Sequence, residues 1–370
     1  MSNAQKVKKD EKINVSDENK LTGVKPNWRD NKENSVLVAE SHIRLLGGYE
    51  NRGYRMLECC CKTYFREYED GAKQFDSAFF CERRLCPMCM WRDSLKTYGE
   101  VSWMMDYIQA RHDFKFIFLT LTVKNVGCDK ITSYLDEFFE AFNRLTKLKR
   151  FKDISKGWFR SFEMTHNWDT GEYHPHFHVI IAVDKSYAEW HGDYMHHSEW
   201  VKMWHSLVGG KHPPSVRINR IYSKDGDKKN YKGAVAETVK YTVTSSDLIY
   251  RPSEKQINLW GEAKAQEYAN KRTDENIGVM SSSLRSRRFL GFAEAFKEAR
   301  KAFKLEKENK DKDNVDGDAE KIREDLAYIL IEYVWNRQYK EFIKSREIEK
   351  GTEKEIQARQ NKGMQIKNKK

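Results

Sequence analysis

The segment YHPHFHVIIA occupies residues 173–182 and places His174, His176 and His178 two positions apart, ahead of an apolar and mostly β-branched run. Successive side chains of a β-strand point to opposite faces of the sheet, so the three imidazoles share one face if the segment is a strand. Neutral imidazoles that converge on one face are good ligands for a divalent metal. The alternative is a surface strand that is merely rich in histidine. The pattern favours a metal-binding strand at the centre of the fold.

A carboxylate is predicted to lie beside these histidines. The sequence NWDTG at 167–171 is typical of a hairpin turn, and the residues before it, 158–166, have the composition of a strand. In an antiparallel hairpin, Glu163 of that strand can reach the imidazoles, which makes a mixed nitrogen and oxygen site suited to Mg²⁺ or Mn²⁺. The predicted ligands are His176 and His178, with a third ligand that is either His174 or Glu163.

The cysteines predict a second metal site. Cys86 and Cys89 form a Cys-x-x-Cys knuckle closed by a proline, Cys81 lies five residues upstream, and a cysteine triplet occupies 59–61. This spacing is typical of a tetrahedral zinc site, which four thiolates would make structural rather than catalytic. Alternatives are a thioredoxin-like redox pair and buried free cysteines. Any of the triplet could be the fourth ligand, but only Cys59 and Cys61 share a strand face, and Cys61 is the expected one.

Composition limits the classes of partner. The 370 residues carry a formal net charge of +11, which suits a polyanion such as nucleic acid, or an anionic membrane surface. No apolar run approaches the roughly 18 residues needed to span a bilayer. The charged N-terminal stretch lacks the apolar core of a secretory signal, so a cytoplasmic location is expected. Structural disulfides are then not expected.

The order of predicted elements indicates an α+β fold, with a central antiparallel sheet, helices packed on it, a zinc-knuckle element and a C-terminal helical module. The predicted strands are 54–65, 75–80, 114–123, 158–166, 173–182 and 215–222. The predicted helices are 87–111, 129–151, 186–207, 230–244, several within 252–305, and 326–343. The predicted organisation is a disordered tail (1–35), a main domain (36–250) that includes the knuckle (59–92), a helical accessory region (251–305), a charged linker (306–325) and a C-terminal helix with a basic tail (326–370).

Four motifs in fixed order resemble a known family. They are the cysteine knuckle, FLTLT at 118–122, His176-Phe177-His178, and Glu237-x-x-x-Tyr241. The chain resembles the replication initiators of rolling-circle plasmids, in the branch of small Gram-positive plasmids. That branch belongs to the His-hydrophobic-His endonucleases. The resemblance covers about residues 50 to 300, and the combination of motifs is more specific than any one of them.

The resemblance implies site-specific, metal-dependent nicking and joining of DNA through a 5′-phosphotyrosine. Tyr241 matches the nucleophilic tyrosine, and Glu237 matches the carboxylate that activates water for termination. The family commonly has a lysine three residues after the tyrosine, whereas this chain has Thr244, so Lys240 is the candidate substitute. The expected DNA-binding residues are Lys240, Arg217 and Arg220.

The expected partners follow from this reaction. The substrate is single-stranded origin DNA, and the 3′-OH that cleavage releases primes a host DNA polymerase. The sequence contains nothing like a nucleotide-binding Gly-Lys-Ser/Thr motif, so a host helicase is expected to unwind the duplex. Two other classes fit parts of the pattern. One is a non-enzymatic, zinc-stabilised DNA-binding regulator, and the other is a transposase or relaxase with the same metal core.

Overall fold

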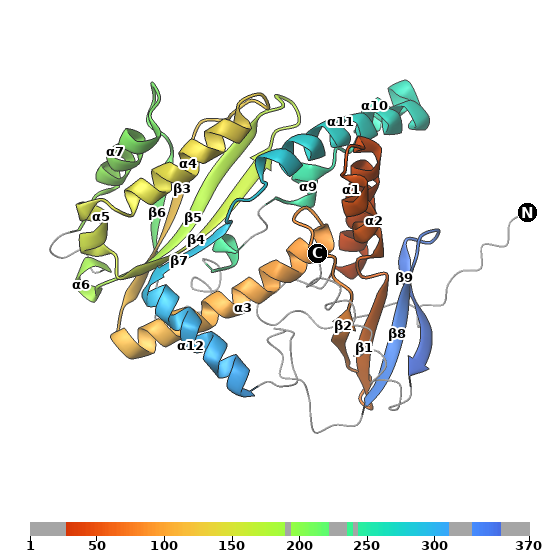
Figure 1. Ribbon diagram of the computed structural model, residues 1–370, viewed down its shortest axis with the longest axis horizontal. Coiled ribbons are helices and arrows are strands. Elements are labelled where there is room, and N and C mark those ends of the chain that lie inside the picture. The colour runs from red at the N-terminus through yellow and green to blue at the C-terminus, as the bar shows by residue number, and fades with distance from the viewer. Residues whose placement is uncertain (1–26, 189–193, 222–234, 240–242, 311–327, 349–370) are drawn as a thin grey trace, which may run out of the picture. The chain divides into compact units, whose positions relative to one another are not determined.

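The computed structural model describes residues 27–188, 194–221, 235–239, 243–310 and 328–348 (Figure 1). The chain divides into two compact units. One combines residues 1–89 with 318–370, and the other is formed by 90–317. The predicted α+β class is confirmed, with an antiparallel sheet in each unit. None of the described helices combines the length and apolar character that crossing a bilayer requires.

The first unit is built on a four-stranded sheet of order β2-β1-β8-β9. Its strands are β1 (Lys62–Tyr68), β2 (Lys73–Ala78), β8 (Tyr328–Asn336) and β9 (Glu341–Ile348). The predicted return strand at 75–80 corresponds to β2. Strand β1 pairs with β8 along the whole length of β1, from Lys62 opposite Val334 to Tyr68 opposite Tyr328. Strands that precede the second unit in the sequence and strands that follow it therefore share one sheet.

The predicted C-terminal helix at 326–343 is wrong, because these residues form the β8–β9 hairpin. Helical spacing of its aromatic residues suggested the helix. However, the segment is rich in isoleucine, valine and aromatic residues that favour strands, and most of β8 is buried. Ring contacts of Tyr333 with Phe65 and of Trp335 with Phe342 hold the hairpin in the sheet.

Two helices of this unit precede β1, where the sequence predicted a tail, a short helical segment at 35–46 and a strand. Helix α1 (Trp28–Leu45) begins inside the predicted tail, because the Asn27 side chain caps it and Trp28 is buried against Phe65 and Phe75. Helix α2 (Glu50–Glu58) occupies the start of the predicted strand at 54–65. Gly53 allows it to lie close to α1, since a Cβ there would lie 2.5 Å from the backbone oxygen of Ala39.

The second unit is built on a five-stranded sheet of order β6-β3-β5-β4-β7. Its strands are β3 (Lys115–Thr122), β4 (Gly157–His166), β5 (Tyr173–Val183), β6 (Val216–Ile221) and β7 (Leu290–Glu294). The histidine strand, β5, lies in the middle, as predicted, and pairs with β4 through the predicted hairpin. Strand β7 was not predicted: it falls in the region expected to be helix-rich and adds an edge strand beside β4.

Helices cover both faces of this sheet, and Figure 1 shows α4 and α12 on opposite sides of it. The helices of the unit are α3 (Pro87–His112), α4 (Ile131–Leu145), α5 (Lys149–Ile154), α6 (Lys185–Ala188), α7 (His197–Val208), a single helical turn at 235–238, α9 (Ser245–Leu248), α10 (Glu254–Trp260), α11 (Glu262–Ser283) and α12 (Ala295–Lys310). On one face Phe138 of α4 stacks on Phe177 at 4.3 Å. On the other, Phe296 of α12 contacts Phe116 and Phe159.

Candidate metal centres and substrate pocket

The predicted metal ligands lie side by side on the middle strands of the five-stranded sheet. Glu163 of β4 is directly opposite His176 of β5. The neighbouring strand β3 places Thr122 opposite His176 and Thr120 opposite His178. Because side chains alternate along strands, these residues share the face that α12 covers further along, at Phe116 and Phe159. Local pairing alone therefore brings the carboxylate to the imidazoles.

The three groups converge on one point. The Oε2 atom of Glu163 lies 3.0 Å from Nε2 of His176 and 2.8 Å from Nε2 of His178. Neighbouring ligands about 2.1 Å from an octahedral ion would be about 3.0 Å apart, so this spacing fits a small divalent ion. Two imidazoles and a carboxylate also form a donor set that such ions accept. The residues Glu163, His176 and His178 therefore form a group that could hold a metal.

The other ring nitrogens of the histidines have partners that orient them. Nδ1 of His176 lies 3.2 Å from the carbonyl oxygen of His174, and Nδ1 of His178 lies 3.4 Å from the hydroxyl of Thr120. A proton on Nδ1 of His176 leaves the lone pair of its Nε2 free to bind a metal. Burial alone would raise the pKa of Glu163, but hydrogen bonds and charge from both histidines lower it to about 2. The carboxylate is thus ionised at neutral pH.

The structure distinguishes between the two candidates for the third ligand, His174 and Glu163. Glu163 belongs to the converging group, whereas His174 does not. The ring of His174 lies 5.4 Å from that of His176, and burial lowers its pKa. Its side chain lines the pocket next to the group. His174 is therefore placed to contact whatever binds beside the metal ligands.

A pocket of about 490 Å³ opens on this face. Besides the histidines, it is lined by Glu237 and by residues of β3 and β6, which lie side by side in the sheet. The lining residues from these two strands and the turn before β6 are Phe118, Thr120, Thr122, Ser215, Arg217, Asn219, Arg220 and Ile221. Both predicted DNA-binding arginines of β6 therefore reach the pocket. Sequence analysis did not identify Asn219 and Ser215, because nothing marks them before the pairing of β6 with β3 is known.

One hydrogen bond fixes the turn that carries Glu237. The hydroxyl of Ser161, on β4, donates to the carbonyl oxygen of Thr238, and both residues are buried. Ser161 is opposite His178 in the sheet, so the bond attaches this turn to the row of residues that holds the metal ligands. The predicted nucleophile Tyr241 and the predicted DNA contact Lys240 lie outside the described residues. Thr244 caps α9 through Asp247.

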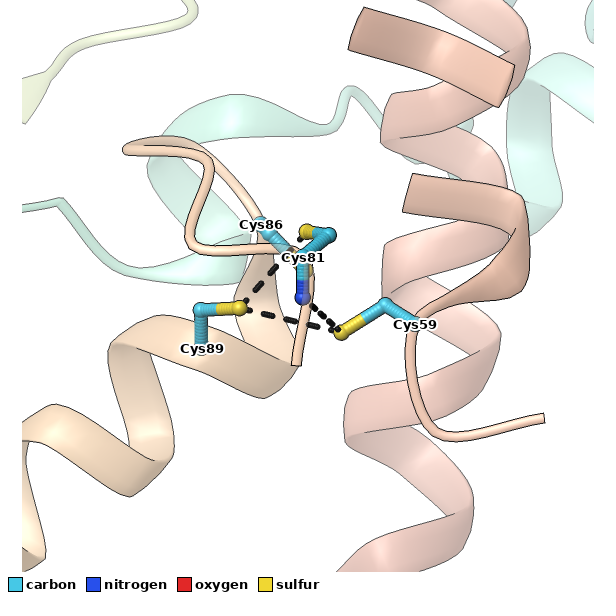
Figure 2. Close-up of side chains that lie close together, drawn as sticks. All are labelled: Cys59, Cys81, Cys86 and Cys89. Atoms are coloured by element: carbon cyan, nitrogen blue, oxygen red, sulfur yellow. Dashed lines mark hydrogen bonds between the residues drawn. The ribbon is translucent and has the colours of Figure 1, made fainter. Parts of the chain in front are cut away.

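The second group lies in the first unit and contains four buried cysteines (Figure 2). Its sulfur atoms lie within 4.8 Å of one another, with 3.7 Å between those of Cys59 and Cys89 and 3.6 Å between those of Cys81 and Cys89. Four sulfurs about 2.3 Å from a tetrahedral zinc ion are about 3.8 Å apart, so the spacing fits zinc. Burial alone would raise the pKa of Cys86, but hydrogen bonds from the other three thiols lower it well below its ordinary value.

The fourth member of this group is Cys59, not the expected Cys61. The sequence reasoning placed the triplet on a strand, whereas α2 ends at Glu58 and β1 begins only at Lys62. In this turn Cys60 has a φ of 52°, so the alternation of a strand does not apply. The thiol of Cys61 instead donates to the carbonyl oxygen of Leu57, at 2.8 Å. The other three members of the group are the predicted cysteines Cys81, Cys86 and Cys89.

The sheet with its Glu-His-His group and the separate four-cysteine group define an α+β protein with two candidate metal centres. A family model described as replication protein, Rep_1, matches residues 72–343. The chain belongs to this family, which confirms the resemblance to rolling-circle plasmid replication initiators. Its role is the initiation of plasmid replication, and DNA is its partner.

Curated relatives agree with this assignment. A protein rep from Streptococcus pneumoniae serotype 2 (strain D39 / NCTC 7466) is 34% identical over 292 residues, which cover 78% of this chain and 83% of the relative. A protein rep from Bacillus amyloliquefaciens is 29% identical over 311 residues, covering 79% and 86%. One from Staphylococcus aureus is 34% identical over 196 residues, covering 52% and 83%. No solved structure matches the chain significantly.

Proposed function

We propose that the chain initiates replication by cutting one strand of the plasmid origin through attack of Tyr241 on a phosphodiester. The observation that supports this most directly is that Glu237 lines the same pocket as His176 and His178. Tyr241 follows Glu237 by four residues in the sequence. A carboxylate for hydrolysis and the ligands for a metal therefore share one pocket, in a chain of the replication protein family.

The pocket suits a single strand of DNA. Arg217, on the exposed edge of the sheet, carries a guanidinium that can bind phosphate oxygens. Asn219 and Ser215 add neutral hydrogen-bonding groups beside it. Attack by the Tyr241 oxygen forms a phosphotyrosine and breaks the bond to the 3′ oxygen. The phenol proton passes to solvent, and the departing oxygen gains a proton to become the 3′-OH primer.

Glu163, His176 and His178 would hold a Mg²⁺ or Mn²⁺ ion, which supplies charge stabilisation to the phosphate that reacts. The protein must lower the barrier further, because a phenol with a pKa near 10 is a poor nucleophile at neutral pH. Positioning of the phosphate by Arg217 and His174 lowers the barrier further. The strand must be unpaired to enter, so a host helicase is expected to open the duplex for a host polymerase.

Glu237 is proposed to end the cycle. After one round of synthesis a second cut is needed, and Tyr241 is still bonded to the DNA from the first cut. Glu237 acts as a general base that takes a proton from water, and the water oxygen attacks the phosphorus at the second cleavage site and breaks its bond to the 3′ oxygen. The 3′-OH formed there attacks the phosphotyrosine, which joins the DNA ends and releases Tyr241 as the phenol. The four-cysteine group is proposed to bind zinc in a structural role, because four thiolates leave no open position for chemistry.

Labelled single-stranded origin oligonucleotides, incubated with the full chain and Mn²⁺, test the proposal. We expect a covalent protein–DNA band that maps to Tyr241 by mass spectrometry and is lost in Tyr241→Phe. The Glu237→Gln variant should form the first adduct but fail to make the second, hydrolytic cut that leads to its release. Nicking that survives Tyr241→Phe contradicts the mechanism and favours another nucleophile. Specific origin binding without nicking by the wild type favours a non-enzymatic regulator.

A further inference from the structure

A buried lysine lies beside the four-cysteine group. Lys32, on α1, has 0% of its side chain exposed. Its ammonium group donates to the carbonyl oxygens of Leu57, at 2.9 Å, and of Cys59, at 2.5 Å. Within the described residues its hydrogen-bond partners are these two carbonyls, and it pairs with no carboxylate. Burial of an ammonium ion without a nearby negative charge costs several kcal/mol, so an anion is expected close by.

The cysteine group can supply that anion. Four thiolates around one divalent ion leave a net charge of about −2, which is itself costly to bury. The same helix makes a second contact with this group, because the hydroxyl of Ser35 lies 3.2 Å from the sulfur of Cys86. Lys32 and Ser35 are three residues apart and so share a helix face. One face of α1 therefore contacts the carbonyl of one cysteine and the sulfur of another.

We infer that Lys32 is the counter-cation of a metal–thiolate centre formed by the four cysteines, and that it raises the affinity of that centre for zinc. The inference rests on the proposed structural zinc site. Lys32 is a positioning and charge-compensating residue and does not bind the ion. It lies on α1, which precedes the segment matched by the family model. Outer groups of this kind typically change metal affinity by about ten- to hundredfold.

A purely structural role for Lys32 makes a different prediction. If its hydrogen bonds to Leu57 and Cys59 only fix the end of α2, an uncharged donor should largely replace it. Lys32→Gln keeps a donor without the charge, Lys32→Met removes both, and Lys32→Arg keeps the charge. Lys62→Met is the matched control, because it removes the same charge from an exposed position one residue after Cys61.

Zinc affinity of the full chain is measured by competition with a chromophoric chelator. Zinc that the wild type binds and Cys59→Ser does not is assigned to the cysteine group. We expect Lys32→Met and Lys32→Gln to bind zinc about ten- to hundredfold more weakly, with Lys32→Arg and Lys62→Met within about threefold of the wild type. Equal affinity of Lys32→Gln and wild type overturns the inference. Failure of the wild type to bind zinc at the cysteines overturns the zinc site itself.

Folding is followed in the same samples by circular dichroism. If Lys32→Met or Lys32→Gln folds only with added zinc, the zinc concentration at half-maximal folding gives the same affinity ratio. A ratio of ten or more relative to wild type supports the counter-cation. A variant that stays unfolded at saturating zinc shows that Lys32 is required by the fold itself, and the inference then fails.

Discussion

Ser161, on the central sheet, donates its hydroxyl to the carbonyl oxygen of Thr238, the residue that follows Glu237. Ser161 is also opposite His178 in the sheet. One side chain thus connects the row of metal-binding candidates to the turn that bears the proposed general base. Positioning of this kind affects the rate of a reaction without affecting the binding of the metal.

Ser161→Ala should therefore slow the hydrolytic second cut, for which Glu237 is the proposed general base, by roughly tenfold, the effect of about 1.4 kcal/mol, because a buried carbonyl loses its donor. The affinity for Mn²⁺ should remain unchanged. Single-turnover cleavage and metal titration measure the two quantities. Ser133→Ala is the control, because the hydroxyl of Ser133 also donates to a backbone carbonyl but from an exposed position on α4. An equal loss of rate in both variants would contradict the positioning role.

Glu163→Gln should weaken Mn²⁺ binding by about ten- to hundredfold, because a neutral amide replaces the carboxylate that both histidines face. Isothermal titration with Mn²⁺ checks this directly. Glu172→Gln provides the same change in the same hairpin, where Glu172 contacts Asn125 instead of the histidines. Unchanged Mn²⁺ binding by Glu163→Gln would exclude Glu163 as a ligand and leave His174 as the third candidate.

Because of His166, the free energy of unfolding should decrease as the solution is made acidic. Burial and the charge of Arg272 lower its pKa from 6.5 to about 4. Between these values the unfolded chain binds a proton that the folded chain does not, so the free energy of unfolding decreases as pH falls from 6.5 to 4. After allowance for solvent screening the loss is on the order of 1 to 2 kcal/mol. Urea unfolding at pH 7 and pH 4.5 should show a smaller difference in His166→Gln than in wild type.

Cys59→Ser should abolish the proposed zinc binding of the first unit and lower its melting temperature, because breaking a structural zinc site removes folding free energy. Cys61→Ser should retain the zinc, since its thiol bonds the carbonyl of Leu57. These two cysteines are two positions apart, so each controls for the other. Elemental analysis and thermal unfolding provide the readouts. Zinc loss in Cys61→Ser with retention in Cys59→Ser would reverse the assignment.

Arg217→Gln should weaken binding of single-stranded DNA and reduce the slope of log affinity against log salt by about one, because one phosphate contact is lost. Fluorescence anisotropy at several salt concentrations measures both. Arg111→Gln is the control, because Arg111 is an exposed arginine at the end of α3 that pairs with Glu298. A slope unchanged by Arg217→Gln would show that this arginine does not contact phosphate.

The histidine site was predictable because its geometry is local. A turn of six residues joins the two strands, so the sequence itself places Glu163 close to His176. The alternation of side chains then selects the face. The same reasoning was unsuccessful for Cys61, because the periodicity of a strand was applied to residues that form a turn after a helix.

Contacts between distant segments were not predictable in this way. The C-terminal hairpin is held by β1, and the partner of Tyr333 is Thr63, so no window of local sequence contains the information. Likewise, nothing in the sequence marks Ser161 or Asn219. The pairing of β6 with β3 brings Asn219 to the pocket, and the fold brings Ser161 of β4 to the carbonyl of Thr238.

The pairing of β1 with β8 has a consequence for biosynthesis. The ribosome makes β1 early and β8 only after the whole histidine-bearing unit has been made, because β8 starts at Tyr328 of 370 residues. Domains fold as they emerge, so the five-stranded sheet can form while the first unit still lacks half of its strands. A chain truncated before β8 would thus carry the metal-binding histidines but expose the edge of β1 to aggregation.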